Sequence, residues 1–213
     1  MFNALTFDRN ITKKEGYKHC RRIFYAGSDF IADDKVENFL LVSPTFEGKV
    51  RGNVYVESLS LSDKLLDELI NNYLEGNSKI ILNLSSTLDE VGSFDKKYGY
   101  SPVFFAEKLG LLEGAYVAGA TYVDKDDLDI IKQNNAEIII TPSLTLGDGL
   151  GIPPIRMMET LGIKTHLGTG LSEYNPNANL LFERDLIRFA ASGYLCTKDA
   201  LSDDFLRKLL IYH

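Results

Sequence analysis

Short apolar runs alternate with amphipathic stretches along most of the chain, and this alternation is the feature that most constrains its fold. The apolar runs include 39–42 (FLLV), 79–84 (KIILNL) and 136–141 (AEIIIT). Each is short enough for a buried strand and is bounded by turn or helix signals. Nearly continuous apolar strands flanked by helices are typical of a parallel sheet with both faces covered.

Helix boundaries can be predicted at several positions. Good N-terminal caps or capping boxes occur at Ser62, at Thr87 with Glu90, at Ser101 before Pro102, and at Asp124. Later helices are predicted at 179–191 and 199–211. The segment 12–26 is also predicted to be helical, because Tyr17, Cys20 and Phe24 fall on one helical stripe that Gly27 can close. A further buried run is expected at 29–32.

The order of these elements predicts one α/β domain over residues 1–213, since no linker, repeat or low-complexity segment divides the chain. We expect about seven strands, close to the eight of a TIM-like (β/α)8 barrel, a fold that starts at roughly 200 residues. An open, doubly wound sheet is the main alternative.

Composition narrows the classes of partner. The chain has 213 residues, of which 45 % are hydrophobic and 25 % charged, as in ordinary globular proteins. A net charge of −7 disfavours nucleic acid or an anionic membrane as the main partner. No apolar run suits a membrane helix and no secretion signal is recognisable, so a cytoplasmic location is expected. The histidines, His19, His166 and His213, are too scattered to suggest a metal site.

Individual motifs leave function open. The glycine-rich segment 146–151 (LGDGLG) follows a strand but lacks the Lys-Ser/Thr of a P-loop, so a plain loop is the simpler interpretation. His166 lies in an apolar strand, where a hydrogen-bonded core imidazole competes with a catalytic role. Asp33 and Glu57 are acidic groups in or after strands. In a barrel, that position suits either catalysis or a loop cap.

Longer segments resemble a known family. The stretch 83–131 (NLSSTLDEVGSFDKKYGYSPVFFAEKLGLLEGAYVAGATYVDKDDLDII) resembles the second half of an amidohydrolase-superfamily barrel, in the branch of aminohydrolase deaminases and chlorohydrolases. The stretch 136–183 resembles the loops and strands that follow, including the family's Gly-Thr-Asp segment. Residues 12–34, with GSDFIAD, resemble its helix and second strand. The resemblance implies a (β/α)8 barrel.

The same resemblance implies a metal-dependent hydrolase whose site residues are missing here. In such enzymes, histidines and an aspartate hold zinc or iron, the bound water attacks the substrate, and a glutamate moves the proton. The fifth-strand histidine falls on Asn83, the glutamate on Ser86, the sixth-strand histidine on Gly119 and the aspartate on Gly170. The fourth-strand region, 54–60, has no histidine, and no counterpart of the first-strand His-x-His is expected.

These losses predict a barrel without the family's metal or its hydrolytic reaction, since glycine has no side chain and asparagine is a poor ligand for transition metals. We expect no zinc or iron cofactor. The old pocket is expected to bind a small ligand through Asn83, Ser86, Thr141 and Thr169, or the chain binds a protein partner. No flanking β-sandwich is expected. Residues 1–7 are expected to supply an atypical first strand; otherwise an incomplete barrel leaves an edge that a homo-oligomer would cover.

An alternative is a hydrolase that acts on C–N bonds of a cyclic amide or amidine without a metal. In this hypothesis Glu57 or Asp33 is the base and His166 the acid. A carboxylate in a largely apolar barrel can have a raised pKa, which suits acid–base work.

Overall fold

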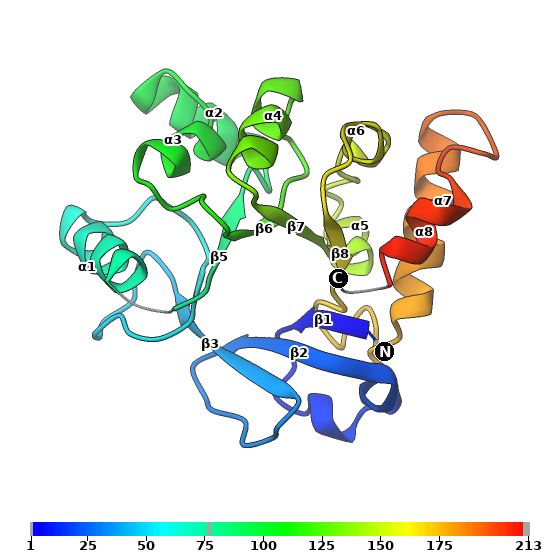
Figure 1. Cartoon of the computed structure of the whole chain (residues 1–213), viewed down its shortest axis with the longest axis horizontal. Coiled ribbons are helices and arrows are strands. Elements are labelled where there is room, and N and C mark those ends of the chain that lie inside the picture. Colours follow the sequence, from blue (N-terminus) through cyan, green and yellow to red (C-terminus); the bar gives the residue numbers. More distant parts are fainter. Residues whose placement is uncertain (1, 76–77, 211–213) are drawn as a thin grey trace.

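A computed structural model describes residues 2–75 and 78–210. It contains one eight-stranded sheet in which every strand pairs in parallel with the next in the chain (Figure 1). The strands are β1 (Phe2–Thr6), β2 (Cys20–Gly27), β3 (Val36–Val42), β4 (Val54–Val56), β5 (Ile80–Leu84), β6 (Tyr116–Gly119), β7 (Glu137–Ile140) and β8 (Thr165–Leu167).

The sheet curls into a nearly closed barrel, because its first and last strands meet. The Thr169 amide donates to the Leu5 carbonyl at 2.8 Å, the Phe7 amide donates to the Gly170 carbonyl at 3.2 Å, and Thr6 forms a parallel bridge with Gly170. The predicted TIM-like barrel is therefore confirmed and the open sheet is wrong. Residues 2–6 supply the first strand, so the barrel leaves no open edge there for a second copy to cover.

Most predicted helices are present. They are α1 (Asp63–Leu74), α2 (Leu88–Tyr98), α3 (Pro102–Lys108), α4 (Lys125–Gln133), α5 (Pro142–Gly147), α6 (Ile155–Leu161), α7 (Leu180–Tyr194) and α8 (Asp203–Lys208). The caps predicted for the first four act as expected: the side chains of Ser62, Thr87, Ser101 and Asp124 each accept a backbone N–H of the first turn. The predicted helix 199–211 is shorter than expected, and residue 211 lies outside the described residues. None of the helices described is long and apolar enough to cross a bilayer.

The helix predicted at 12–26 is wrong. Two short 3₁₀ helices, η1 (Ile11–Lys13) and η2 (Glu15–His19), lead directly into β2. Within β2, Ile23 and Tyr25 join the outer core, while Phe24 and Ala26 face the barrel interior. This two-residue period is the strand period, and it outweighs the helical stripe because both faces of β2 become buried. The expected run at 29–32 forms no strand.

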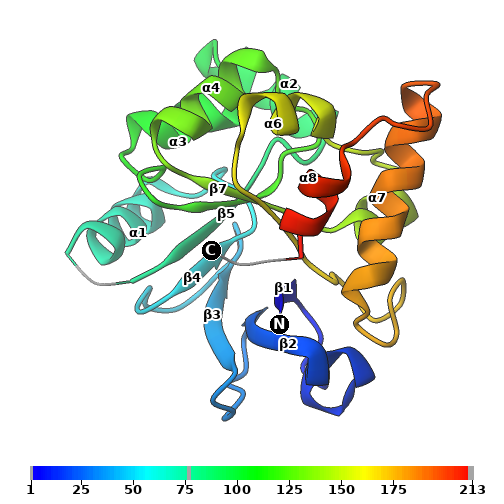
Figure 2. The ribbon, with the colours of Figure 1, turned by 45° about the vertical axis from the view of Figure 1, so that its right-hand side comes forward.

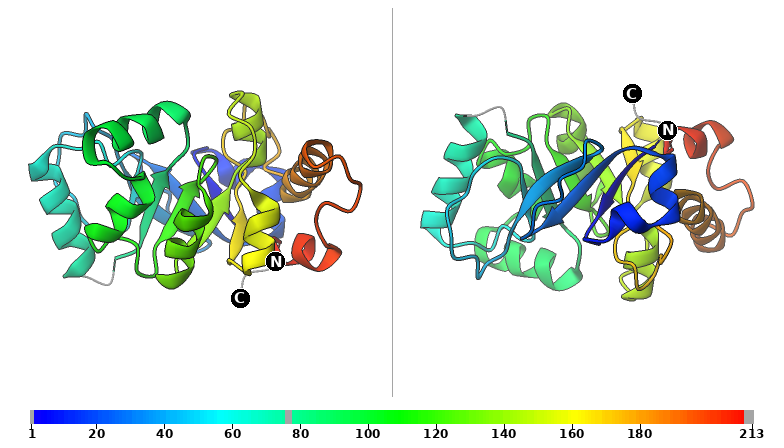
Figure 3. Two further views of the ribbon diagram at one scale, coloured as in Figure 1. Left: turned by 90° about the horizontal axis from the view of Figure 1, so that it is seen from above. Right: turned by 90° about the horizontal axis from the view of Figure 1, so that it is seen from below.

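Helices cover the barrel unevenly. The links from β2 to β3 and from β3 to β4, residues 28–35 and 43–53, contain no helix. Figures 1 and 2 show α1 to α4 and α6 around β4 to β8, while β1 to β3 extend away from them. Views along the perpendicular direction show the same asymmetry (Figure 3). Loops therefore cover β2 and β3, where helices cover the other strands of the barrel.

Apolar and aromatic side chains fill the inside of the barrel. They form a cluster separate from the outer core, made of Leu5, Phe24, Ala26, Phe39, Tyr55, Ile81, Tyr116, Ala118 and Ile139, with Phe7 and Leu41 against it. Ring centroids lie 5.1 Å apart for Phe7 and Tyr55, and 5.2 Å apart for Phe24 and Tyr116. Such pairs pack at the distances preferred by aromatic rings. The interior is thus a packed core.

Candidate functional site

The ends of β5 and β6 form the centre of the candidate site, at the C-terminal end of the barrel strands. The Ser86 hydroxyl donates to Asn83 Oδ1 at 2.5 Å, and the Asn83 amide donates to the Glu57 carbonyl at 3.1 Å. Gly119, paired beside them, has a φ of +78°. A Cβ at Gly119 would overlap Ser86 Oγ and would lie 2.7 Å from Asn83 Oδ1. Asn83 and Ser86 therefore occupy the space that a side chain at position 119 would need.

The first strand provides a second part of this site, which the sequence prediction missed. Strand alternation turns Leu5 and Phe7, two residues apart, into the barrel interior. They lie at the C-terminal end of β1, the first strand of the barrel, and neither is a histidine. This end of the strand presents apolar side chains, and Phe7 packs edge-on against Tyr55.

These residues do not fit the family metal. Leucine and phenylalanine donate no electron pair, and an amide such as that of Asn83 is a poor ligand for zinc or iron. Gly170 has a φ of +55°, and a Cβ there would lie 3.0 Å from that of Leu144. Nowhere in residues 2–75 and 78–210 do three His, Cys, Asp or Glu side chains gather closely enough to hold an ion. The side chain of His19, and His213, lie outside the part described.

The other predicted ligand-binding residues lie at the same end but differ in access. Glu57 follows β4, and its side chain is exposed. Thr141 and Thr169 follow β7 and β8 and are buried. The Thr169 hydroxyl is buried without a hydrogen-bond partner in the described structure. The structure therefore groups Glu57, Asn83 and Ser86 at one accessible edge and places the threonines beneath the surface.

Asp33 lies elsewhere. It stands three residues before β3, at the end of the barrel where strands begin, because residues 29–32 do not form the expected strand. The Tyr17 hydroxyl donates to its carboxylate at 2.5 Å and the Lys35 amide donates at 2.9 Å. These two hydrogen bonds lower the pKa of Asp33, the Tyr17 bond most. Asp33 therefore does not stand at the C-terminal end of a strand, the position that made it a candidate base.

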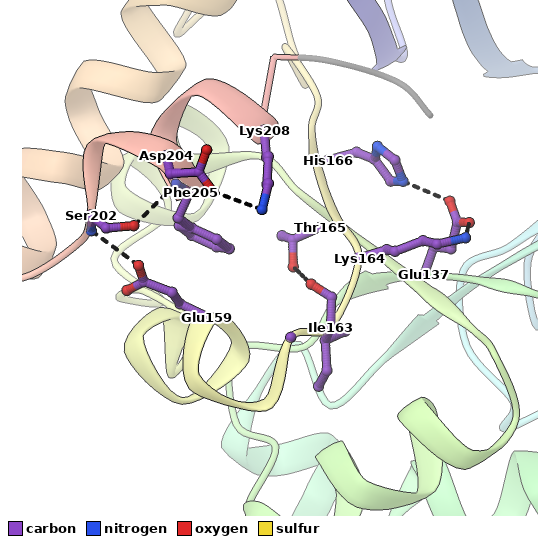
Figure 4. Close-up of a pocket in the computed structure, with 11 residues that line it drawn as sticks. Glu137, Glu159, Ile163, Lys164, Thr165, His166, Ser202, Asp204, Phe205 and Lys208 are labelled. Atoms are coloured by element: carbon purple, nitrogen blue, oxygen red, sulfur yellow. Dashed lines mark hydrogen bonds and ion pairs between the residues drawn. The ribbon is translucent and has the colours of Figure 1, made fainter.

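His166 also faces the end where strands begin. Its Nε2 lies 2.7 Å from Glu137, the first residue of β7, and Lys164 lies 3.1 Å from the same carboxylate. The hydrogen bond from His166 is the main reason that the pKa of Glu137 is lowered. Both residues border a cavity of about 390 Å³ that α6 and α8 also line, with Phe205 and Lys208 on its far side (Figure 4).

The structure thus separates the three catalytic candidates. Glu57 stands at the C-terminal end of the strands, whereas Asp33 and His166 stand at the N-terminal end, and their catalytic roles stay predictions. Glu90, which the sequence analysis assigned only to a capping box, is in direct contact with Ser86. The Glu90 carboxylate accepts the Ser86 amide at 2.9 Å, and burial raises its pKa against the opposing pull of backbone N–H groups.

The curated proteins most similar in sequence that are described below share one name. No profile of a known protein family matches the chain. It is 32 % identical over 133 residues to the 5-methylthioadenosine/S-adenosylhomocysteine deaminase of Caldicellulosiruptor saccharolyticus, which covers 62 % of this chain and 31 % of that protein. The deaminase of the same name from Haloarcula marismortui is 27 % identical over 161 residues, 74 % of this chain and 37 % of the relative. The chain therefore spans about a third of the length of these relatives.

Solved structures share the fold. The E241Q mutant of atrazine chlorohydrolase from Arthrobacter aurescens TC1, complexed with zinc and atraton, superposes with a TM-score of 0.72 at 15 % identity, over 90 % of this chain and 56 % of that one. Guanine deaminase from C. acetobutylicum superposes with a TM-score of 0.64 at 18 % identity, over 88 % and 49 %. In sequence the chain is thus similar to deaminases, and in its barrel it is similar to deaminases and chlorohydrolases of the amidohydrolase superfamily.

Proposed function

We propose that this barrel works without the family metal and without hydrolytic deamination, and that its mouth binds a small polar ligand. The observation that carries the proposal is the hydrogen bond that the Ser86 hydroxyl donates to Asn83 Oδ1, because these two side chains fill the space beside Gly119. A metal-bound water needs ligands that hold the ion and an open coordination position. Apolar packing of Leu5 and Phe7 supplies neither.

The ligand-binding part of the proposal is supported by what remains at the accessible edge. Glu57 is exposed, and Asn83 and Ser86 are half-buried beside it. A carboxylate, an amide and a hydroxyl can together recognise N–H and O–H groups of a small polar molecule. The packed barrel interior holds these groups in place, as a rigid scaffold holds a binding loop.

Metal analysis and an activity assay test the non-hydrolytic part. Protein purified without chelator should contain far less than one zinc or iron per chain. It should release no ammonia from 5-methylthioadenosine, the compound named for its relatives' activity. One tightly held zinc or iron per chain, or metal-dependent ammonia release, would overturn the proposal.

The same assay distinguishes the metal-independent alternative. Ammonia release that survives a chelator and disappears in Glu57→Gln would identify a hydrolase with an altered site. Glu47→Gln is the matched control, because Glu47 is also an exposed glutamate but belongs to the β3–β4 link. Loss of activity in both variants would point to a general effect of charge.

Ligand binding is tested separately with 5-methylthioadenosine as the probe, using calorimetric titration. We expect saturable binding that weakens roughly tenfold in Asn83→Ala, since removing a hydrogen-bond partner from a bound ligand costs about 1–3 kcal/mol. Binding that is unaffected by both Asn83→Ala and Glu57→Gln would place the ligand elsewhere. If 5-methylthioadenosine does not bind at all, a ligand of this type at the mouth is rejected.

A further inference from the structure

Glu90 is a buried carboxylate to which the proposed function gives no role. It lies in the first turn of α2, and its Oε1 is buried and forms no hydrogen bond in the described structure. Its Oε2 accepts the Ser86 amide at 2.9 Å. In a capping box this glutamate accepts the amide of the N-cap residue, which is Thr87 here. The hydrogen bond to Ser86 extends the reach of Glu90 to the residue before the cap.

The turn between β5 and α2 depends on such a contact. Ser85 directly follows β5 and has a φ of +51°, a left-handed conformation that is unfavourable for residues other than glycine. Its side chain is fully buried, and its carbonyl accepts the Tyr122 amide at 2.9 Å. A strained residue keeps its conformation only where the surrounding contacts hold it. The carboxylate of Glu90 is one of these contacts, because it binds backbone N–H groups of this turn.

A chain of hydrogen bonds connects Glu90 to the mouth of the barrel. The Ser86 amide donates to Glu90, the Ser86 hydroxyl donates to Asn83 Oδ1 at 2.5 Å, and the Asn83 amide donates to the Glu57 carbonyl at 3.1 Å. Ser86 thus binds Glu90 through its backbone and Asn83 through its side chain. A weaker bond to Glu90 would free the Ser86 backbone and, with it, the hydroxyl that orients Asn83.

We propose that Glu90 is a positioning residue for the mouth, and that its carboxylate holds Ser86 against Asn83 and thereby fixes the amide that binds the ligand. This inference rests on the proposed function, because it concerns the same ligand site. Glu90 acts through Ser86 and does not touch the ligand, since Oε1 is buried and Oε2 is bonded to the Ser86 amide. A hydrogen bond to an ionised group is roughly twice as strong as one between neutral groups, so the anion holds Ser86 more firmly than the neutral acid does.

Acid should therefore loosen the mouth. Burial raises the pKa of Glu90 and outweighs the opposing pull of the backbone N–H groups of Ser85, Ser86 and Thr87. As pH falls through that raised pKa, the carboxylate takes up a proton and its bond to the Ser86 amide weakens.

Two other titratable groups lie close by, at the end of β4. Burial, and then the charges of Glu57 and Glu90, raise the pKa of the Tyr55 hydroxyl, so Tyr55 stays neutral in the acid range. Glu57 is an exposed carboxylate at the mouth itself, and Asp89 is an exposed carboxylate in the same helical turn as Glu90. The experiment therefore includes a variant of each.

Nuclear magnetic resonance of the full chain without ligand provides the first test. A titration from about pH 7 to about pH 4.5 should shift the signals of the Ser86 backbone amide and the Asn83 side-chain amide with one common midpoint, above the ordinary glutamate value of about 4.3. In Glu90→Gln both shifts should disappear, because glutamine keeps an acceptor oxygen for Ser86 but takes up no proton. In Glu57→Gln and in the matched control Asp89→Asn, the common titration should remain.

Two results of this titration would overturn the inference. One is a wild type in which the Ser86 and Asn83 signals have different midpoints or do not shift. The other is a common titration that survives in Glu90→Gln. The wild-type titration decides the case by itself if Glu90→Gln does not fold.

Binding of 5-methylthioadenosine at several pH values provides the second test. The affinity of the wild type should fall roughly fivefold between about pH 7 and about pH 4.5, whereas Glu90→Gln should stay at the low affinity throughout. Asp89→Asn should behave like the wild type. A fall that persists in Glu90→Gln and disappears in Glu57→Gln would assign the pH dependence to Glu57 and contradict the role of Glu90. If the probe does not bind, the proposed function fails, while the titration without ligand still decides whether Glu90 positions Asn83.

Discussion

Glu183 shows at the scale of one residue how a buried charge is tolerated in this fold. It is fully buried, and its carboxylate accepts the Ser143 amide at 2.8 Å, the Ser143 hydroxyl at 2.6 Å and the Asn175 amide at 2.7 Å. Burial raises its pKa, and these hydrogen bonds oppose the rise. The carboxylate thereby fixes the start of α5 and the loop before α7 onto one helix.

Replacing Glu183 by glutamine should lower the free energy of unfolding by about 1–3 kcal/mol near pH 5. The new NH2 group would face one of the N–H or O–H donors of Ser143 and Asn175, and that donor would lose its hydrogen bond. Since the folded pKa is raised, the folded wild type holds its proton above the unfolded pKa of about 4.3, and its stability falls as pH rises through that window. The variant lacks this fall, so the difference between the two proteins should narrow with rising pH.

Urea unfolding at several pH values measures this difference. Glu173→Gln serves as the control, because Glu173 is exposed in the same region of the chain and should change stability little. A difference that widens as pH rises would show that the fold stabilises the anion, contrary to the expected direction.

At the scale of elements, the contact between β1 and β8 decides whether the barrel closes. Gly168 stands where the two strands meet, and its amide donates to the Ile140 carbonyl at 2.7 Å. A Cβ at Gly168 would lie 2.7 Å from Thr141 Cγ2 and 2.9 Å from the Leu5 carbonyl oxygen. Backbone cannot give way as a flexible side chain can, so closure depends on a residue without a side chain.

Gly168→Ala should therefore lower the free energy of unfolding by about 1–3 kcal/mol, the usual cost of overpacking. Gly92→Ala is the matched control, and it should raise stability by about 0.5–1 kcal/mol, because alanine favours an exposed helix interior over glycine. Chemical unfolding of both variants provides the measurement. Equal effects in the two would mean that β1 and β8 adapt to the added methyl group.

The whole molecule is covered on one side by helices and on the other by loops. Links 28–35 and 43–53 run beside β2 to β4, whereas α2, α3 and α4 flank β5 to β7. The backbone amides of a strand covered by loops become exposed to solvent through smaller local openings than those of a strand covered by packed helices. The two sides should consequently differ in local stability although they form one sheet.

Amide hydrogen exchange can detect this difference. Peptides from β2 and β3 should exchange faster than peptides from β5 and β6, by roughly tenfold or more, because sub-global opening of the loop-covered side costs less free energy. The comparison should be made at a protein concentration where the oligomeric state is constant. Uniform protection in all four strands would show that the barrel opens only as a unit.

Local signals predicted much of the fold. Thr87 and Asp124 marked helix starts because a cap depends on neighbours within one turn. The helix predicted at 12–26 was wrong because the apolar residues there fit both the helical and the strand period. Burial of both faces of β2 selected the strand. The position of Leu5 and Phe7 in the barrel interior was not predicted, because the sequence of a single apolar pair does not show which side of the sheet it faces.

The sequence by itself determined the order of strands and helices and the absence of histidine and carboxylate side chains at positions 83, 119 and 170, since residue type and local spacing suffice for both. Only the tertiary structure decided that residues 2–6 close the barrel, that Asn83 and Ser86 fill the space beside Gly119, and that Glu57 and His166 stand at opposite ends. Those outcomes depend on strand register and direction, which arise from contacts between residues far apart in the chain.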